Sequence, residues 1–372
     1  MSTHLKVPLL LIVLFLLPAF TFLPRNTYAD TSLWVKYSGT TGLTPIVSPT
    51  PGSWDAAYVL SPRAVYDGST YRMWFSGGNT TLTGIGYAAS QDGVTWNVRS
   101  SPVLTPGAQG TWDSGSVSLG SVLKNGTQFM MYYRGTNTTS YVTGAIGLAT
   151  SSDGITWTKF SGNPVLTSTT FAADQGYIAS PFVIKLELTY NMWYTGKNVT
   201  FQKESPYTTI LYATSLDGIH WDKWPKPVLT PSTDQNAWDS AAVYSPSVYF
   251  NGTTFGLWYT GLGQSLRNPQ IGVATSPDGA TWTRSYYNPI LSPSAGAWDS
   301  AGVEQPNVII GGKSIMMFYD GVSDTSAGRI GVAFAQQGAQ VYPLPEFHYI
   351  DLLFVISAFA VIAAVRRRKQ PI

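Results

Sequence analysis

Residues 276–282 read Ser-Pro-Asp-Gly-Ala-Thr-Trp, and closely similar stretches occur at three earlier places in the chain. The four copies end at Trp96, Trp157, Trp221 and Trp282, which are 61, 64 and 61 positions apart. Self-similarity at a nearly constant period indicates one structural unit that is copied along the chain. Features shared by the copies are therefore expected to build the scaffold, and features that differ between copies are candidates for function.

One unit is clearest between Pro227 and Trp282. Short runs rich in Val, Tyr, Phe and Trp alternate there with Asn-Gly and Asp-Gly dipeptides. These runs predict short antiparallel strands joined by hairpins, because Asn, Asp and Gly tolerate the positive φ angles that tight turns need. Each unit supplies four such strands, which is the composition of one propeller blade.

The number of units is five, counted on the second strand of each. These strands are predicted at residues 71–77, 129–135, 190–196, 255–261 and 315–321. The last unit lacks the Asp-Gly-x-Thr-Trp stretch, but residues 32–39 resemble residues 155–162, and Trp34 precedes Trp96 by one period. We therefore predict an all-β fold: a five-bladed β-propeller of four-stranded antiparallel blades, closed by the N-terminal strand.

The two ends of the chain differ from the repeats. Residues 1–29 have the charged start, apolar core and small-residue end of a signal peptide, and residues 30–343 hold the propeller. Residues 344–372 contain Pro-Glu-Phe, an apolar run and a basic tail, and resemble archaeal PEF-type sorting signals. The resemblance implies a sortase-like processing enzyme, with a plain transmembrane anchor as the alternative. We expect an exported glycoprotein held at the membrane or cell surface.

Composition narrows the possible partners. Without the two terminal segments the body has 16 basic and 18 acidic residues, so its charge does not favour nucleic acid. The chain has no Cys, which excludes disulfides and thiolate metal sites. His220 is the only His of the body and stands in a repeated hairpin, so a Ser-His-Asp triad or a His-rich metal site is not supported. No metal ligand is predicted, and no cofactor is identified.

The loops between the second and third strands vary in length and sequence, whereas the hairpins at the other face are nearly identical. Variable loops on a rigid scaffold usually carry specificity, so the site is expected on the variable-loop face. Two sets of repeated acids are expected to be structural instead. Acids of the Trp-Asp pairs should accept loop hydrogen bonds, and those of the Asp-Gly pairs should form turns; the two sets are Asp55, Asp113, Asp239 and Asp299, and Asp92, Asp153, Asp217 and Asp278.

Polar residues that break the repeat are the better site candidates. Glu304 lies where the other inner strands have Leu60, Ser118, Ala179 and Tyr244. Asp320 ends the second strand of the last blade, where the other blades have Ser, Arg or Thr. Glu304 and Asp320 are the catalytic candidates, and three further outliers are candidates for substrate binding: Arg63, Arg134 and Asp174.

The blade pattern over about residues 31–336 resembles the five-bladed arabinanase, xylosidase and invertase group of glycoside hydrolases. Glu304-Gln305-Pro306 is similar to the Glu-x-Pro that carries the general acid in that group. The resemblance implies a carbohydrate ligand. The chain departs from the group in having no Asp-Pro in any blade, which leaves only Asp320, Asp55 or Asp174 as the second carboxylate that hydrolysis normally needs.

Several functions remain open at this point. Saccharide recognition is favoured, with binding alone ahead of catalysis because Asp-Pro is absent, so whether the protein is an enzyme is undecided. An active glycoside hydrolase is the alternative. The Ser-x-Asp-Gly-x-Thr-Trp pattern also resembles the Asp-box of sialidases but lacks one residue, and sialidases have six blades. A structural role in a surface layer is the remaining interpretation.

Overall fold

The protein is described from a computed structural model, which separates the chain into two units, residues 1–31 and residues 32–372. All described residues lie in the second unit. They are residues 34–79, 81–137, 144–169, 173–198, 208–264, 268–310, 314–323 and 326–335.

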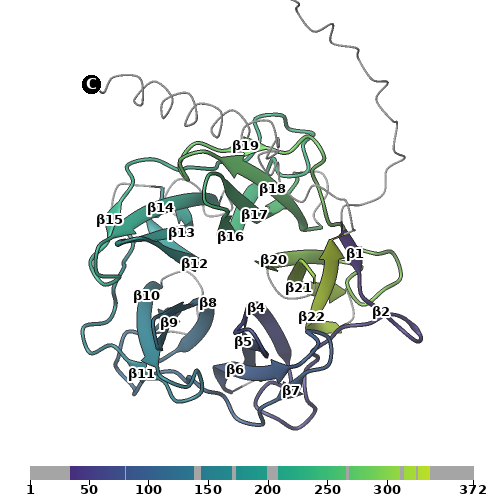
Figure 1. Cartoon of the computed structure of the whole chain (residues 1–372), viewed down its shortest axis with the longest axis horizontal. Helices are drawn as coiled ribbons and strands as arrows, with labels where there is room; N and C mark the ends of the chain where they lie inside the picture. Colours follow the sequence, from purple (N-terminus) through teal and green to yellow (C-terminus); the bar gives the residue numbers. More distant parts are fainter. Residues whose placement is uncertain are drawn as a thin grey trace, which may run out of the picture. The chain divides into compact units, whose positions relative to one another are not determined.

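The described residues form five four-stranded antiparallel sheets (Figure 1), together with one two-stranded hairpin. Blade I consists of β4 (Tyr58–Tyr66), β5 (Tyr71–Gly78), β6 (Thr83–Ser90) and β7 (Asn97–Val98). Blade II consists of β8 (Ser116–Asn125), β9 (Gln128–Thr136), β10 (Ala145–Ser151) and β11 (Thr158–Lys159). Blade III consists of β12 (Gly176–Leu186), β13 (Thr189–Asn198), β14 (Thr209–Ser215) and β15 (Asp222–Lys223). Blade IV consists of β16 (Ala242–Phe250), β17 (Phe255–Leu262), β18 (Gln270–Ser276) and β19 (Thr283–Arg284).

Blade V joins the two ends of the described chain. It consists of β20 (Gly302–Ile309), β21 (Met316–Ser323), β22 (Ser326–Ala335) and β1 (Trp34–Lys36), and β1 is its outermost strand. Trp34 pairs with Ala335 and Lys36 with Ala333 in an antiparallel register. The predicted closure by the N-terminal strand is confirmed. A short hairpin of β2 (Ser38–Gly39) and β3 (Gly42–Leu43) follows outside the blades.

The first strand of each blade is innermost. β4, β8, β12, β16 and β20 contact one another in this order, and β20 contacts β4 again (Figure 1). The predicted five-bladed propeller is therefore confirmed. Pairing of β1 with β22 covers part of the outer edge of blade V, and covered edges protect an all-β protein against edge-to-edge association.

The repeated hairpins hold neighbouring blades together. In the last copy, the Asp278 carboxylate accepts the N–H groups of Ala280 and Thr281 at 2.9 and 2.7 Å, as predicted for a turn former. Gly279 has a φ of 75°, which favours glycine. Its carbonyl accepts a hydrogen bond of 2.8 Å from the indole of Trp193 in the preceding blade. The repeat therefore supplies both the turn and an inter-blade contact.

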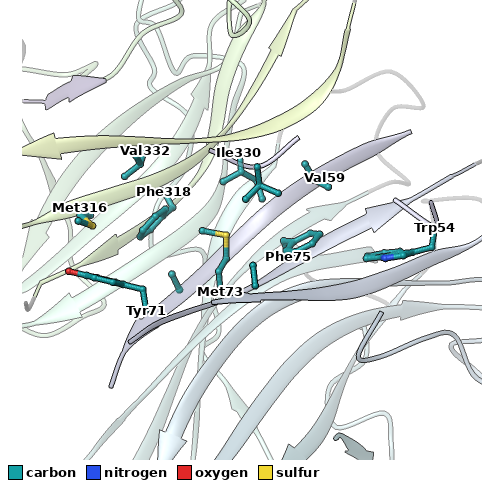
Figure 2. Packing of buried hydrophobic residues seen from close by; sticks show 12 residues of the cluster. Trp54, Val59, Tyr71, Met73, Phe75, Met316, Phe318, Ile330 and Val332 are labelled. Atoms are coloured by element: carbon teal, nitrogen blue, oxygen red, sulfur yellow. The ribbon is translucent and has the colours of Figure 1, made fainter. Parts of the chain in front are cut away.

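The core lies between blades rather than within one of them. Figure 2 shows this packing at the closure, where Met316 and Phe318 of blade V lie beside Tyr71, Met73 and Phe75 of blade I. All five side chains are buried. Each blade thus shares its apolar surface with the next, so loss of one interface exposes residues of two blades.

The terminal segments lie outside the described residues. This applies to the predicted signal peptide, the PEF-type signal and the apolar run with its basic tail. Within residues 34–335 as described, the structure contains no helix with the length and apolarity needed to cross a membrane.

Candidate active site

Each blade places two residues side by side where its inner strand begins and its second strand ends. These antiparallel pairs are Leu60–Ser76, Ser118–Arg134, Ala179–Thr195, Tyr244–Thr260 and Glu304–Asp320. Residues directly opposite in an antiparallel sheet have Cβ atoms about 4.5–5.5 Å apart. Blade V therefore brings two carboxyl groups together at a position where no other blade has one.

A backbone bulge follows the first residue of each pair. In four blades the next residue has a positive φ: 57° at Ser61, 48° at Ser180, 51° at Ser245 and 55° at Gln305. Each of these four residues precedes a Pro, and the strand register shifts there. Such backbone conformations cost free energy for residues other than glycine, and they concentrate at functional sites.

In four blades, all except blade II, the second residue of the pair accepts the backbone N–H that follows the first residue of the next pair. Thr195 accepts the N–H of Ser245 at 2.9 Å, and Thr260 accepts the N–H of Gln305 at the same distance. Asp320 does this for Ser61, whose N–H lies 2.9 Å from both carboxylate oxygens. A hydroxyl suffices in blades III and IV, so the scaffold does not require a carboxyl group at position 320.

Asp320 is fully buried, and its electrostatic surroundings favour the neutral acid. Burial raises the pKa of Asp320 well above its usual range, and the neighbouring Glu304 raises it further. The Ser61 N–H and the Arg63 guanidinium act in the opposite direction. The two carboxyl groups therefore do not carry two full negative charges near neutral pH, since like charges at this distance disfavour ionisation.

Glu304 is the more accessible member of the pair. It is half-buried, and its Oε2 accepts a hydrogen bond of 2.9 Å from the hydroxyl of Tyr244 in blade IV. Burial raises the pKa of the Glu304 carboxyl, whereas the Tyr244 hydroxyl lowers it. The pKa of Tyr244 is in turn raised by its own burial and by Glu304, so this phenol stays protonated and remains a donor. Glu304 is thus an oriented carboxyl group that can hold a proton.

Arg63 is buried beneath this site rather than exposed to a ligand. Its exposed fraction is 2%, and its Nη1 donates to the carbonyls of Pro62 and Pro306 at 3.0 and 3.2 Å. Its Nε donates to the carbonyl of Gly120, so one guanidinium joins blades I, II and V. Burial lowers the pKa of Arg63 to about 10, with Asp320 opposing the shift. Among the described residues it forms no ion pair with Glu304.

Arg134 occupies the end of the second strand in blade II. It is also buried, and its Nε donates to the carbonyl of Ile178 at 3.0 Å. Its guanidinium lies 5.2 Å from the ring centre of Tyr177, a half-buried residue. Arg134 therefore supports an aromatic side chain at the start of the inner strand in blade III. Direct contact of Arg63 or Arg134 with a saccharide remains a prediction.

Asp174 differs from Glu304 and Asp320 because it is paired with a basic side chain. It accepts hydrogen bonds from Lys223 at 2.5 Å and from Thr169 at 2.7 Å, and it is 1% exposed. The Trp-Asp acids of three other blades have the same arrangement, in which Lys159, Arg284 and Lys36 bind Asp113, Asp239 and Asp299. These contacts do not support a role for Asp174 in substrate binding.

The expectation for the Trp-Asp acids fails in one blade. Asp113, Asp239 and Asp299 accept hydrogen bonds from loops, basic residues or tyrosines, as predicted. Asp55 is equally buried, but its Oδ1 has no hydrogen-bond partner among the described residues. The prediction of a hydrogen-bonded loop acid is therefore wrong for Asp55, because blade I lacks the basic partner found in the other blades.

Two contributors to the site were missed by the reasoning from sequence. The sequence singles out Tyr244 only as the blade IV residue at the position of Glu304, and it gives no signal for Ser61 beyond the absence of Asp-Pro. Each of them acts through a contact with a neighbouring blade. Tyr244 binds Glu304, about 60 residues away in the sequence, and Ser61 binds Asp320, about 260 residues away. The aligned repeat contained one usable signal, since Tyr244 and Glu304 occupy equivalent positions in adjacent blades.

The described residues do not group three or more His, Cys, Asp or Glu side chains around a potential metal position. What this arrangement offers is one accessible carboxyl group that can donate a proton, a buried carboxyl group beside it, and phenols from blades III and IV. A carboxyl group near aromatic side chains is suited to a sugar, whose C–H surfaces pack on aromatic rings and whose oxygens accept protons.

Known proteins resemble this chain in sequence and in fold. Residues 171–336, which include blades III and IV and three strands of blade V, match the glycosyl hydrolases family 32 N-terminal domain. A glycosyl hydrolase from Bacteroides ovatus superposes with a TM-score of 0.61 at 17% identity, covering 80% of this chain and 93% of that one. The chain has a glycoside hydrolase-like propeller fold.

Relatives found by sequence cover most of the propeller. An uncharacterised protein of Mycobacterium tuberculosis is 29% identical over 292 residues, which are 76% of this chain and 93% of the relative. The 1,2-beta-oligomannan phosphorylase of Thermoanaerobacter sp. (strain X514) is 27% identical over 241 residues, 62% of this chain and 72% of the relative. A structure from work on GH130 hydrolases that target beta-1,2 mannosidic linkages has a TM-score of 0.61 at 16% identity, covering 82% and 96%.

The raised pKa of Asp320 leads to a testable pH dependence. A raised pKa means that the folded state keeps its proton where the unfolded state has lost it, so this contribution to stability is complete below about pH 4 and declines as pH rises. Asp320→Asn cannot titrate and keeps one oxygen for the Ser61 N–H. We expect the variant to match the wild type in free energy of unfolding near pH 4 and to exceed it at pH 7, measured by urea unfolding.

The matched control is Asp67→Asn. The Arg72 guanidinium and the N–H groups of its turn hold the pKa of Asp67 below its usual range, although burial opposes this. The control should therefore lose stability near pH 7 and recover relative to the wild type on acidification. Equal pH dependence in the wild type and in Asp320→Asn would show that Asp320 is ionised in the folded protein.

Proposed function

We propose that the protein cleaves a glycosidic bond in an oligosaccharide, with Glu304 as the proton donor. The observation that carries this proposal is the half-buried Glu304 carboxyl, which Tyr244 orients at a position where the repeat needs no acid. A general acid must hold its proton near the working pH, and burial raises the pKa of Glu304 in this direction. The glycoside hydrolase-like fold makes a saccharide the natural ligand.

The burial and hydrogen bonding of Asp320 indicate where the nucleophile of the reaction comes from. Hydrolysis normally uses a second carboxylate, about 5–5.5 Å away in retaining and 6.5–9.5 Å away in inverting enzymes, to attack or to activate water. Asp320 is 0% exposed, and the Ser61 N–H engages both of its oxygens, so it is poorly placed for either role. Among the described residues, this favours a nucleophile that comes from solution.

Inorganic phosphate is such a nucleophile. A phosphate oxygen attacks the anomeric carbon, the bond from this carbon to the glycosidic oxygen breaks, and the Glu304 proton passes to the leaving oxygen. The products are a sugar phosphate and a shortened oligosaccharide. The 27% identity to a 1,2-beta-oligomannan phosphorylase supports both phosphorolysis and β-1,2-linked mannose oligomers as the substrate class.

Saccharide binding without turnover is the second candidate. The burial of Asp320 and the absence of Asp-Pro in every blade favour it, since both remove the usual second carboxylate. For either function we propose a location at the outer cell surface, based on the signal-like residues 1–29 and the sorting-type residues 344–372.

The test is incubation with β-1,2-mannose oligomers in the presence and absence of inorganic phosphate. The proposal expects a mannose phosphate that forms only when phosphate is present. Free mannose without phosphate would instead indicate hydrolysis and a second carboxylate. Saturable binding without any product would establish the second candidate, and absence of binding to a mannan and glycan array would contradict both.

A further inference from the structure

Four blades share an arrangement of a buried acid, a basic side chain and a tyrosine. The acid precedes the inner strand, the cation comes from the outermost strand, and the phenol comes from the second strand. In blade V, Lys36 Nζ lies 2.5 Å from Asp299 Oδ2, and the Tyr319 hydroxyl lies 3.4 Å from the same oxygen. The equivalent sets are Asp113–Lys159–Tyr133, Asp174–Lys223–Tyr194 and Asp239–Arg284–Tyr259.

Strand register identifies the corresponding positions in blade I. The four basic residues each pair with an Ala of the third strand, and in blade I the residue that pairs with the equivalent Ala88 is Val98. The residue at the tyrosine position is Phe75. Blade I therefore keeps the acid, Asp55, and replaces both of its polar partners with apolar side chains.

Asp55 is 1% exposed, and its Oδ1 has no hydrogen-bond partner among the described residues. An uncompensated buried carboxylate costs several kcal/mol, so a counter-charge is strongly favoured. The aliphatic side chain of Val98 cannot carry one. Trp54, the residue before Asp55, packs against Phe75 (Figure 2), and the centres of their rings are 6.1 Å apart. Among the described residues, no basic side chain is paired with Asp55, which favours a cation from solution as the source of the positive charge.

Blade V shows which other oxygens surround this position. Lys36 Nζ donates to the Ser292 carbonyl at 2.6 Å and to the Ser294 hydroxyl at 2.8 Å, in addition to Asp299. Val47 bridges Ile330 as Leu291 bridges Ile271, and both bridges precede their acid by eight residues. The blade I counterparts are therefore the Ser48 carbonyl and the Thr50 hydroxyl.

We propose that blade I binds an alkali-metal cation, Na⁺ or K⁺, between the Asp55 carboxylate, the Ser48 carbonyl and the Thr50 hydroxyl. An all-oxygen ligand set suits hard cations. One carboxylate balances one positive charge, which is the charge that the lysine or arginine supplies in the other blades. Ca²⁺ takes six to eight oxygens and is usually held by several carboxylates, whereas this site has one. The inference is independent of the proposed enzymatic function.

The test compares melting temperatures in NaCl, KCl and choline chloride at equal ionic strength, because choline is too bulky for the site. The wild type should melt about 2–4 °C higher with saturating Na⁺ or K⁺, with a saturable concentration dependence. Asp55→Asn should lose this dependence. Val98→Lys restores the residue type of the other blades, so it should raise the melting temperature in choline chloride and make the protein insensitive to the cation.

If Asp55→Asn fails to fold, the melting temperatures of Val98→Lys in the three salts are sufficient to test the proposal. An anomalous signal beside Asp55 in crystals soaked with thallium(I) would locate the cation directly. Equal melting temperatures of the wild type in all three salts would overturn the proposal, as would a cation dependence that persists in Val98→Lys. Stabilisation by micromolar Ca²⁺ but not by Na⁺ or K⁺ would overturn the assignment of a monovalent cation.

Discussion

Glu304→Gln is expected to lower turnover of a saccharide substrate by about 10²–10⁴-fold, the range that general acid catalysis contributes. The substitution removes the only proton that Glu304 could donate and changes little else. The amide oxygen of Gln can still accept the hydrogen bond that Tyr244 now donates to Oε2 at 2.9 Å. Burial already disfavours the charged form of Glu304, so a neutral amide should leave the melting temperature nearly unchanged.

The matched control for this experiment is Glu187→Gln. Glu187 is exposed and lies in the turn after β12, so the same chemical change there should leave both turnover and melting temperature unchanged. Rates should be measured together with saccharide affinity. A Glu304→Gln variant that binds the oligomer but does not cleave it identifies the proton donor. Full activity in this variant would remove Glu304 from the reaction.

The largest expected effect on stability comes from Trp34→Ala. Trp34 is 1% exposed, and it packs with Trp258 of blade IV and with Tyr319 of blade V in one apolar cluster. Replacing a buried Trp by Ala typically costs about 3–5 kcal/mol, through lost burial and the cavity that remains. The outer strand of blade V holds only three residues, so weakening it should also expose the edge of β22.

Trp224→Ala is the matched control for Trp34→Ala. Trp224 is 46% exposed, and its ring lies 6.2 Å from that of Tyr212. Its loss should change the free energy of unfolding by less than about 1 kcal/mol, measured by guanidinium unfolding. In Trp34→Ala, hydrogen exchange should accelerate in β22 and β21 before other blades. Uniform acceleration around the ring, or equal losses in both variants, would mean that closure does not depend on this strand.

The repeat allowed the architecture to be predicted from sequence because it is local and redundant. Each Asp-Gly hairpin is specified within a few residues, as in the contact of Asp278 with the two N–H groups that follow it, and four copies make the period unmistakable. The position of Trp34 relative to this period was sufficient to predict closure, since one period contains one outer strand. The alignment of blades also singled out Glu304 and Asp320, because no other blade has a carboxyl group at either of these two positions.

The chemical state of those residues could not be predicted in this way. The sequence suggested that two carboxylates could cooperate, but the register makes Asp320 a buried neighbour whose oxygens bind the Ser61 N–H of the next blade. Arg63 was a candidate ligand contact, yet it lies beneath the site and binds carbonyls from three blades. Burial, pKa and hydrogen-bond partners depend on contacts between blades, which a residue-by-residue alignment does not contain.

Asp55 illustrates the same division. The sequence by itself determined that four blades carry a Trp-Asp pair, and it indicated one shared structural role for them. Only the tertiary structure revealed that Lys36, Lys159 or Arg284 neutralises three of these acids from strands 45 to 263 residues away, and that Val98 stands at the equivalent place beside Asp55. The sequence thus determined the repeated scaffold through short-range turn and strand preferences, whereas the charges that distinguish one blade from another were decided by long-range packing.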